Sequence, residues 1–242
     1  MPFLSPNQSS FFRRAGYLKL RSLIHEDLIE YVRSAIDEEL TARKPPFKLN
    51  DAGAIYRLDG LYKRGETFKQ LMTLPELLDS VESLVGPNIE LTLNRHNHLA
   101  INRPGETIER LHRDILQWTR GIVTAIFYIE DASMANGCTL ILPTSQYLPF
   151  IGTPNNGGTW MDEHSVFNDL AEQAIPIHAE KGDILLVDSL AFHTAGKNNS
   201  CLTRMSIAAG YHSVDELDGL QQHEKRVLVR GQRIYRGNDL KL

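Results

Sequence analysis

The stretch DSLAFHTAGKNNSCLTR, residues 188–204, joins the end of one apolar segment to the start of another. The pattern GDILLVDS (182–189) leads into it, and RMSIAAGYH (204–212) follows it. The Gly-Lys-Asn-Asn-Ser run between them is typical of a turn, because glycine and asparagine readily take turn conformations. The stretch therefore predicts two neighbouring strands that direct one histidine, His193, and one arginine, Arg204, towards the interior of the fold.

More strand patterns lie upstream, starting at residue 89. They are separated by Gly, Pro and Asn turn signals and read IELTLNRHNHLAIN (89–102), GIVTAIFYIED (121–131), CTLILP (138–143) and AIPIHAE (174–180). Several short strands without helices between them are typical of sandwiches and barrels of the jelly-roll or cupin class. Residues 149–174 are too many for a simple connection, and we expect this segment to cover a site.

The first third of the chain is instead typical of helices. The segment HEDLIEYVRSAIDEEL (25–40) carries apolar residues at helical spacing, and TLPELLDSVESLVG (73–86) could begin at Thr73 as its N-cap. Between them, GAIYRLDGLYKRG (53–65) predicts a short strand and a loop. We therefore expect one mainly β domain with flanking helices: a mainly helical part (1–88), a jelly-roll core (89–215) and a C-terminal extension (216–242).

Composition and charge narrow the range of functions. The chain has 242 residues, of which 42% are hydrophobic and 23% charged, as in ordinary globular proteins. Its formal net charge of -4 provides no overall positive field for nucleic acid or an anionic membrane. Two cysteines do not make a disulfide framework, and no apolar run is long enough to span a bilayer. We expect a cytoplasmic protein that acts on a small molecule and binds neither nucleic acid nor membrane; its oligomeric state stays open.

A second motif, LHRD (111–114), gives the histidine at 193 a chemical context. His112 and Asp114 are two residues apart, so in an extended segment their side chains share a face. Together with His193 they make the two-histidine, one-carboxylate set that binds Fe(II) and leaves positions open for other ligands. Arg204 fits the same chemistry, because a guanidinium can hold the far carboxylate of 2-oxoglutarate while its oxo-acid end chelates iron. The ordered set predicts a non-haem oxygenase that uses Fe(II), 2-oxoglutarate and O2.

These segments resemble the phytanoyl-CoA dioxygenase family of Fe(II)/2-oxoglutarate oxygenases over nearly the whole chain. The motifs that carry the resemblance include FFRRAGYLKL (11–20), INRPGE (101–106), LHRD (111–114), EDASMANGCTLILPTSQ (130–146) and EKGDILLVDSLAFHTAGKNNS (180–200). The resemblance implies a double-stranded β-helix core, with iron on His112, Asp114 and His193 and the co-substrate on Arg204. It also implies a dioxygenase that hydroxylates a small molecule and releases succinate and CO2.

The resemblance implies further contacts with the co-substrate. Arg57, in IYRLDG, matches a basic residue that family members place near it, and Leu99 and Ile126 match positions that line its pocket. Both Leu99 and Ile126 fit the core of the barrel equally well. The carboxylate ligand is present as Asp114, whereas related halogenases lack it to make room for halide. This difference favours hydroxylation over halogenation.

Candidate substrate contacts lie on two segments. Asn97 and His98 precede the INRPGE motif, and Trp118 and Arg120 follow LHRD. Trp118 fits the core of the barrel equally well. His96 and His98 also share a face and could form a cupin-type metal pair, but no matching downstream carboxylate is evident.

Two other functions stay open at this point. One is a non-catalytic, cupin-like binding protein that has kept the barrel. The other is a zinc-dependent hydrolase that uses the same two histidines and the aspartate. In such a hydrolase the general base is hard to name and Arg204 has no role.

Overall fold

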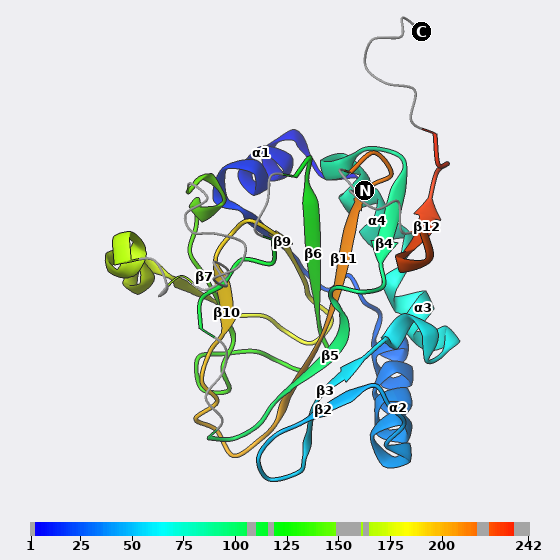
Figure 1. The fold of residues 1–242 in the computed structure, drawn as a ribbon, viewed down its shortest axis with the longest axis vertical. Helices are drawn as coiled ribbons and strands as arrows, with labels where there is room; N and C mark the ends of the chain where they lie inside the picture. Colours follow the sequence, from blue (N-terminus) through cyan, green and yellow to red (C-terminus); the bar gives the residue numbers. More distant parts are fainter. Residues whose placement is uncertain are drawn as a thin grey trace, which may run out of the picture.

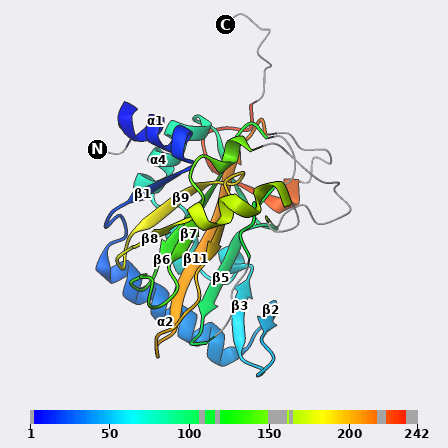
Figure 2. The same ribbon diagram turned by 90° about the vertical axis from the view of Figure 1, so that its left-hand side faces the viewer.

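The structure is a computed structural model, and it describes residues 3–105, 110–115, 119–148, 161, 165–216 and 223–234. A large antiparallel sheet forms its centre (Figure 1). A smaller antiparallel sheet lies against one face of it, and helices cover the other face (Figure 2). The fold is thus mainly β with flanking helices, as the sequence predicts.

The large sheet has nine strands, and the small one has three. In spatial order the large sheet runs β1 (Tyr17–Leu20), β9 (Ile184–Asp188), β6 (Ile122–Tyr128), β11 (Arg204–Ser213), β5 (Asn97–Asn102), β3 (Ile55–Asp59) and β2 (Phe47–Leu49). Strand β4 (Ile89–Thr92) also pairs with β11, and β12 (Arg226–Arg230) pairs with β4. The small sheet runs β10 (His193–Ala195), β7 (Thr139–Ile141) and β8 (Ile175–Ile177).

Four α-helices precede the fourth strand. They are α1 (Pro6–Ala15), α2 (Glu26–Ala42), α3 (Glu66–Met72) and α4 (Pro75–Val85). Short 3-10 helices cover Leu61–Lys63, Ser145–Tyr147, Ser165–Gln173 and His223–Lys225. The apolar stripe predicted for residues 25–40 is the buried face of α2, where Leu28, Val32 and Ile36 join the main core.

The side-chain alternation of the strands separates the core from a cavity. On β11, Ile207 and Ala209 are fully buried in the main core with the helices, whereas Arg204 and Ser206 line a cavity on the opposite face. Successive side chains of a strand point to opposite faces, so one strand serves both surfaces. The polar face of the large sheet therefore looks towards the small sheet.

The strand patterns from residue 89 onwards are confirmed, except that 89–102 forms two strands, β4 and β5, with a turn between them. Two other local predictions are wrong. Thr73 does not cap α4; its hydroxyl donates to the carbonyl of Lys69 (2.7 Å) and thus ends the preceding helix, α3. His193 and Arg204 do not lie on neighbouring strands: β10 pairs with β7 in the small sheet, and β11 pairs with β4, β5 and β6 in the large one. The two residues face the same cavity from different sheets.

A buried polar cluster ties the turn after β10 to both sheets. The Asn102 side chain donates to the carbonyl of Gly196 (3.0 Å), and the Asn198 side chain donates to the carbonyl of Asn102 (3.0 Å). Gly137 packs against this cluster with φ +75°, and a Cβ there would lie 2.2 Å from the Gly196 oxygen. The close approach of two backbones at this point requires glycine.

Gly137→Ala should therefore destabilise the protein by about 3 kcal/mol, through both the backbone clash and the left-handed conformation. Gly105→Ala is the matched control, because Gly105 has the same φ of +75° with nothing within 4 Å of the added Cβ. The control should lose only about 1 kcal/mol. Urea unfolding of both variants measures the difference, and equal losses would show that the contact with Gly196 is unimportant.

None of the helices in the described part of the chain combines the length and the apolar character that a bilayer span requires.

Candidate metal centre and co-substrate pocket

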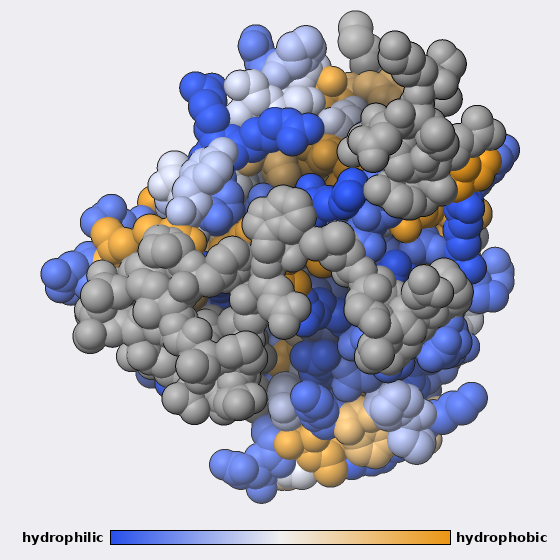
Figure 3. Space-filling model, turned by 45° about the horizontal axis from the view of Figure 1, so that its top comes forward, coloured by the Kyte–Doolittle hydropathy of each residue, from blue (hydrophilic) through white to orange (hydrophobic). Residues whose placement is uncertain are grey.

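One cavity of about 360 Å³ brings together most of the predicted site residues. Its lining comes from both sheets and from the LHRD segment, and it includes His112, Asp114, His193, Arg204, Arg57 and Ile126. The surface view in Figure 3 shows hydrophilic residues gathered at the centre of the face turned to the viewer.

Three of these residues form a cluster that could hold a metal ion. The ligand atoms of His112, Asp114 and His193 all lie within 4.8 Å of one another. Nε2 of His112 is 3.9 Å from Asp114 Oδ1, and Nε2 of His193 is 3.7 Å from the same oxygen. The backbones of His112 and His193 exchange two hydrogen bonds, of 3.0 and 2.9 Å, which seat the LHRD segment beside β10.

Backbone carbonyls orient both imidazoles. Nδ1 of His112 lies 3.0 Å from the carbonyl oxygen of Arg110, and Nδ1 of His193 lies 3.0 Å from that of Ala191. A carbonyl can only accept, so these hydrogen bonds favour the tautomer with the proton on Nδ1. The lone pair of each ring then lies on Nε2, the atom that would bind a metal.

The two oxygens of the Asp114 carboxylate have different neighbours. The Thr124 hydroxyl donates to Oδ2 (2.7 Å) and lies 3.1 Å from the Ser189 hydroxyl. The other oxygen, Oδ1, is buried and lies 2.9 Å from Nε2 of His96. Burial alone would raise the pKa of Asp114, but the imidazoles of His96 and of the two cluster histidines outweigh it and hold this pKa well below its ordinary value.

This donor set fits Fe(II). A buried carboxylate oxygen and two oriented imidazole nitrogens are the ligands of the two-histidine, one-carboxylate iron site. A buried anion that stays ionised needs a compensating cation, which a divalent metal would supply.

Thr124→Val should weaken Fe(II) binding about tenfold, because it removes the hydroxyl that orients Asp114 while keeping the shape of the side chain. Anaerobic calorimetric titration of the metal-free protein measures the affinity. Thr73→Val, which removes a hydroxyl at the end of α3, should bind Fe(II) as the wild type does. Equal affinity in all three proteins would show that Thr124 does not support the ligand.

Arg204 places a positive charge in the same cavity, and no ion pair within the described residues offsets it. Its side chain is buried, with Nη1 donating to the Ser206 hydroxyl (3.3 Å) and Nε without a hydrogen bond to any described residue. Burial lowers the pKa of Arg204, which shows that its surroundings disfavour the charge. A guanidinium in this state is suited to an anionic ligand, and a carboxylate matches its geometry.

Three further predicted residues lie where the sequence places them. Arg57 lines the cavity and forms an ion pair with Asp59 (2.7 Å). Ile126 and His98 line it as well. His98 is buried, and burial together with the charge of Arg57 holds its pKa well below the ordinary value, so the imidazole is neutral.

The other predicted contacts do not reach the cavity. Leu99 lies in the main core, on the face of β5 opposite to His98, which is the alternative that the sequence leaves open. Asn97 is occupied in the fold, where its side chain accepts from the backbone of Tyr62 (2.8 Å). Arg120 is exposed and pairs with Asp215 (3.1 Å).

Some predicted residues lie outside the described part of the chain, and two supporting residues of the site were not predicted. Trp118 lies outside the described residues, as does most of the segment 149–174 that was expected to cover the site. Sequence reasoning missed Thr124 and Ser189 as supports of the carboxylate. Thr124 could have been found as a single polar residue within the apolar pattern of β6. Ser189 could not, because its contact with Thr124 joins residues far apart in the sequence.

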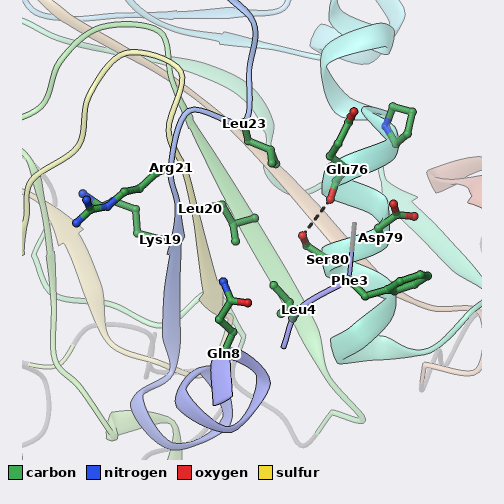
Figure 4. Close-up of a pocket in the computed structure, with 11 residues that line it drawn as sticks. Phe3, Leu4, Gln8, Lys19, Leu20, Arg21, Leu23, Glu76, Asp79 and Ser80 are labelled. Atoms are coloured by element: carbon green, nitrogen blue, oxygen red, sulfur yellow. Dashed lines mark hydrogen bonds between the residues drawn. The ribbon is translucent and has the colours of Figure 1, made fainter. Parts of the chain in front are cut away.

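A larger cavity lies elsewhere, between α1, β1 and α4 (Figure 4). Its volume is about 770 Å³, and its lining contains Lys19, Arg21, Glu76 and Asp79 but neither histidine nor cysteine. The Ser80 hydroxyl there donates to the backbone of its own helix (2.9 Å). The residue types that the predicted chemistry needs are therefore in the smaller cavity.

Comparison with known proteins agrees with this geometry. A model of the family described as phytanoyl-CoA dioxygenase (PhyH) matches residues 12–206. The peroxisomal phytanoyl-CoA dioxygenase of Bos taurus is 25% identical over 261 residues, which cover 93% of this chain and 75% of that protein. The human enzyme of the same name is 25% identical and covers 88% of this chain and 69% of its own length.

Solved structures share the fold. The iron-bound structure of EctD from S. alaskensis has a TM-score of 0.75 at 17% identity, covering 88% of this chain and 78% of that one. The epimerase SnoN from nogalamycin biosynthesis, in complex with Fe3+ and alpha ketoglutarate, has a TM-score of 0.71 at 18% identity, covering 94% and 96%. These likenesses confirm the predicted jelly-roll fold.

Proposed function

Because the chain belongs to the phytanoyl-CoA dioxygenase family, we propose that it oxidises a small molecule in the cavity that holds His112, Asp114, His193 and Arg204. It is an Fe(II)- and 2-oxoglutarate-dependent dioxygenase. One observation carries the assignment of the site: a cluster that could hold a metal and a buried arginine, without an ion pair to any described residue, line the same cavity.

The three clustered residues would hold the metal through Nε2 of each histidine and Oδ1 of the aspartate. When bound, Fe(II) would supply the activation of O2, which converts 2-oxoglutarate to succinate and CO2 and leaves one oxygen atom for the substrate. The chain itself fixes these ligands before the metal arrives, through Thr124 on the carboxylate and carbonyls on both imidazoles. Pre-oriented ligands reduce the reorganisation that binding requires.

Arg204 would bind the far carboxylate of 2-oxoglutarate by two parallel hydrogen bonds. Since Arg204 lies on the large sheet and His193 of the metal cluster on the small one, the co-substrate would span the cavity between them, with Ile126 on its wall. The neutral imidazole of His98 and the ion-paired Arg57 lie in the same lining. Binding to a buried guanidinium excludes water from that end of the cavity and sets the orientation of the oxo-acid end.

We propose hydroxylation as the outcome, because the carboxylate ligand that halogenases lack is present as Asp114. The relatives are phytanoyl-CoA dioxygenases by name, so an acyl-CoA thioester is one candidate substrate and a free metabolite is another. We also propose that the chain forms one catalytic domain, because helices and sheet share a continuous core. A cytoplasmic location fits the two free cysteines, one of them exposed.

Turnover of 2-oxoglutarate tests the proposal. The protein with Fe(II) should consume O2 and form succinate in equal amounts, slowly without substrate and faster when the correct substrate is supplied. Zn(II) should occupy the same ligands and suppress the reaction. Hydrolysis supported by Zn(II) without O2 would favour a hydrolase, and metal binding without any succinate would favour a binding protein.

A further inference from the structure

His96 lies beside the metal cluster but is not a member of it. It ends the turn between β4 and β5 and lines the cavity. Its Nε2 is 2.9 Å from Asp114 Oδ1, which is closer than either cluster imidazole at 3.7 and 3.9 Å. The described residues contain one group of clustered ligand atoms, and His96 is outside it. The position therefore matches a neighbour of the carboxylate rather than a fourth ligand.

The backbone of this turn is built to direct the ring inwards. His96 has φ +48°, in the left-handed region that residues other than glycine seldom adopt. The Thr92 hydroxyl holds the turn by donating to the carbonyl of Arg95 (2.8 Å). Gly210 on β11 makes room for it, since a Cβ there would lie 2.6 Å from the Thr92 hydroxyl and 3.7 Å from the Cβ of His96.

The two oxygens of Asp114 thus have different neighbours. Thr124 donates to Oδ2 from β6, and His96 stands next to Oδ1 from the β4–β5 turn. The terminal torsion of an aspartate is broad, so a single hydrogen bond leaves the carboxylate some rotation. A group on the second oxygen restricts that rotation and keeps Oδ1 facing the two imidazoles.

We propose that His96 is a positioning residue of the metal centre, which holds Asp114 from the side opposite Thr124 and thereby strengthens metal binding. The proposal rests on the function proposed above. Partners that orient a metal ligand typically contribute tenfold to hundredfold in metal affinity. The left-handed backbone at His96 is then a local strain that serves the site.

Three substitutions separate the contact from the backbone. His96→Ala removes the ring. His96→Asn suits the left-handed backbone but is too short to place a nitrogen where Nε2 lies. His96→Gln can place an amide nitrogen at a similar distance from the backbone. His178→Ala is the matched control, because His178 is exposed and lies outside the cavity lining.

The test is anaerobic titration of each full-length, metal-free protein with Co(II), followed by its visible spectrum, which reports the ligand geometry. His96→Ala and His96→Asn should each weaken Co(II) binding by roughly 10- to 100-fold and change the spectrum. His96→Gln should recover most of the affinity, and His178→Ala should match the wild type. Thermal unfolding of the metal-free variants verifies that each is folded.

Unchanged or tighter Co(II) binding in His96→Ala would overturn the proposal. Wild-type affinity in His96→Asn would also overturn it, since the backbone conformation alone would then account for the effect of residue 96 on metal binding. These outcomes are separate from failure of the proposed function. That failure appears as Co(II) binding by the wild type together with no succinate from the Fe(II)-loaded protein supplied with 2-oxoglutarate and O2. A wild type that binds no Co(II) would overturn both.

Discussion

Asp114→Asn should abolish Fe(II) binding and the turnover of 2-oxoglutarate that depends on it. Asp114 supplies the single carboxylate of the cluster, and its Oδ1 is buried beside the two imidazoles. The amide keeps the shape of the side chain but loses the charge that a divalent cation requires. Because removal of a residue that merely orients a ligand weakens binding by 10- to 100-fold, loss of the ligand itself should exceed about 100-fold.

Calorimetry with Fe(II) under anaerobic conditions measures this loss, and succinate formation measures the activity. Asp188→Asn is a suitable control: Asp188 lies at the end of β9 close to Asp114, and burial raises its pKa, but it is outside the ligand cluster. The control should bind Fe(II) within about threefold of the wild type, the range expected when no ligand or ligand partner is lost. Near wild-type affinity in Asp114→Asn would contradict the assignment of the metal centre.

Arg204→Met should have two effects of opposite sign. The affinity for 2-oxoglutarate should fall by roughly 30- to 5000-fold, because losing one partner of a buried charge pair costs about 2–5 kcal/mol. The stability of the protein without ligand should stay the same or rise, because an unpaired buried guanidinium is replaced by an apolar side chain of similar length. Fe(II) binding in the absence of 2-oxoglutarate should not change.

Titration with 2-oxoglutarate and urea unfolding of the apoprotein measure the two effects separately. Arg103→Met is the matched control; its guanidinium donates to the backbone of Ile55 (3.0 Å), and the residue is outside the cavity lining. The control should keep its affinity for 2-oxoglutarate. A loss of affinity below fivefold in Arg204→Met, or a lower stability of the ligand-free variant, would contradict the role of Arg204.

The metal cluster was predictable because each part had a local signal. His112 and Asp114 are two residues apart on an extended segment, and the alternation of β11 directs Arg204 to the cavity. The sequence predicts that His193 faces the cavity, but it does not predict which sheet contains the strand of His193. The partner of β10 is β7, about fifty residues earlier in the chain, and a turn sequence carries no information on so distant a pairing.

Errors among the remaining residues have a common cause. A shift of one residue along a strand moves a side chain to the opposite face, so Leu99 lies in the core while His98 lines the cavity. The sequence pairs His96 only with His98. Its contact with Asp114 depends on a left-handed backbone conformation that the sequence does not predict. Residues that act through tertiary contacts, such as Ser189, have no periodic pattern to reveal them.

The most direct test of the account is anaerobic titration of the wild-type apoprotein with Fe(II) and then 2-oxoglutarate, followed by visible absorption. The account predicts a weak charge-transfer band that needs both components, is absent in Asp114→Asn and weakens in Arg204→Met. A protein that binds Fe(II) but develops no band with 2-oxoglutarate would contradict the claim that this cavity holds the metal and the co-substrate together.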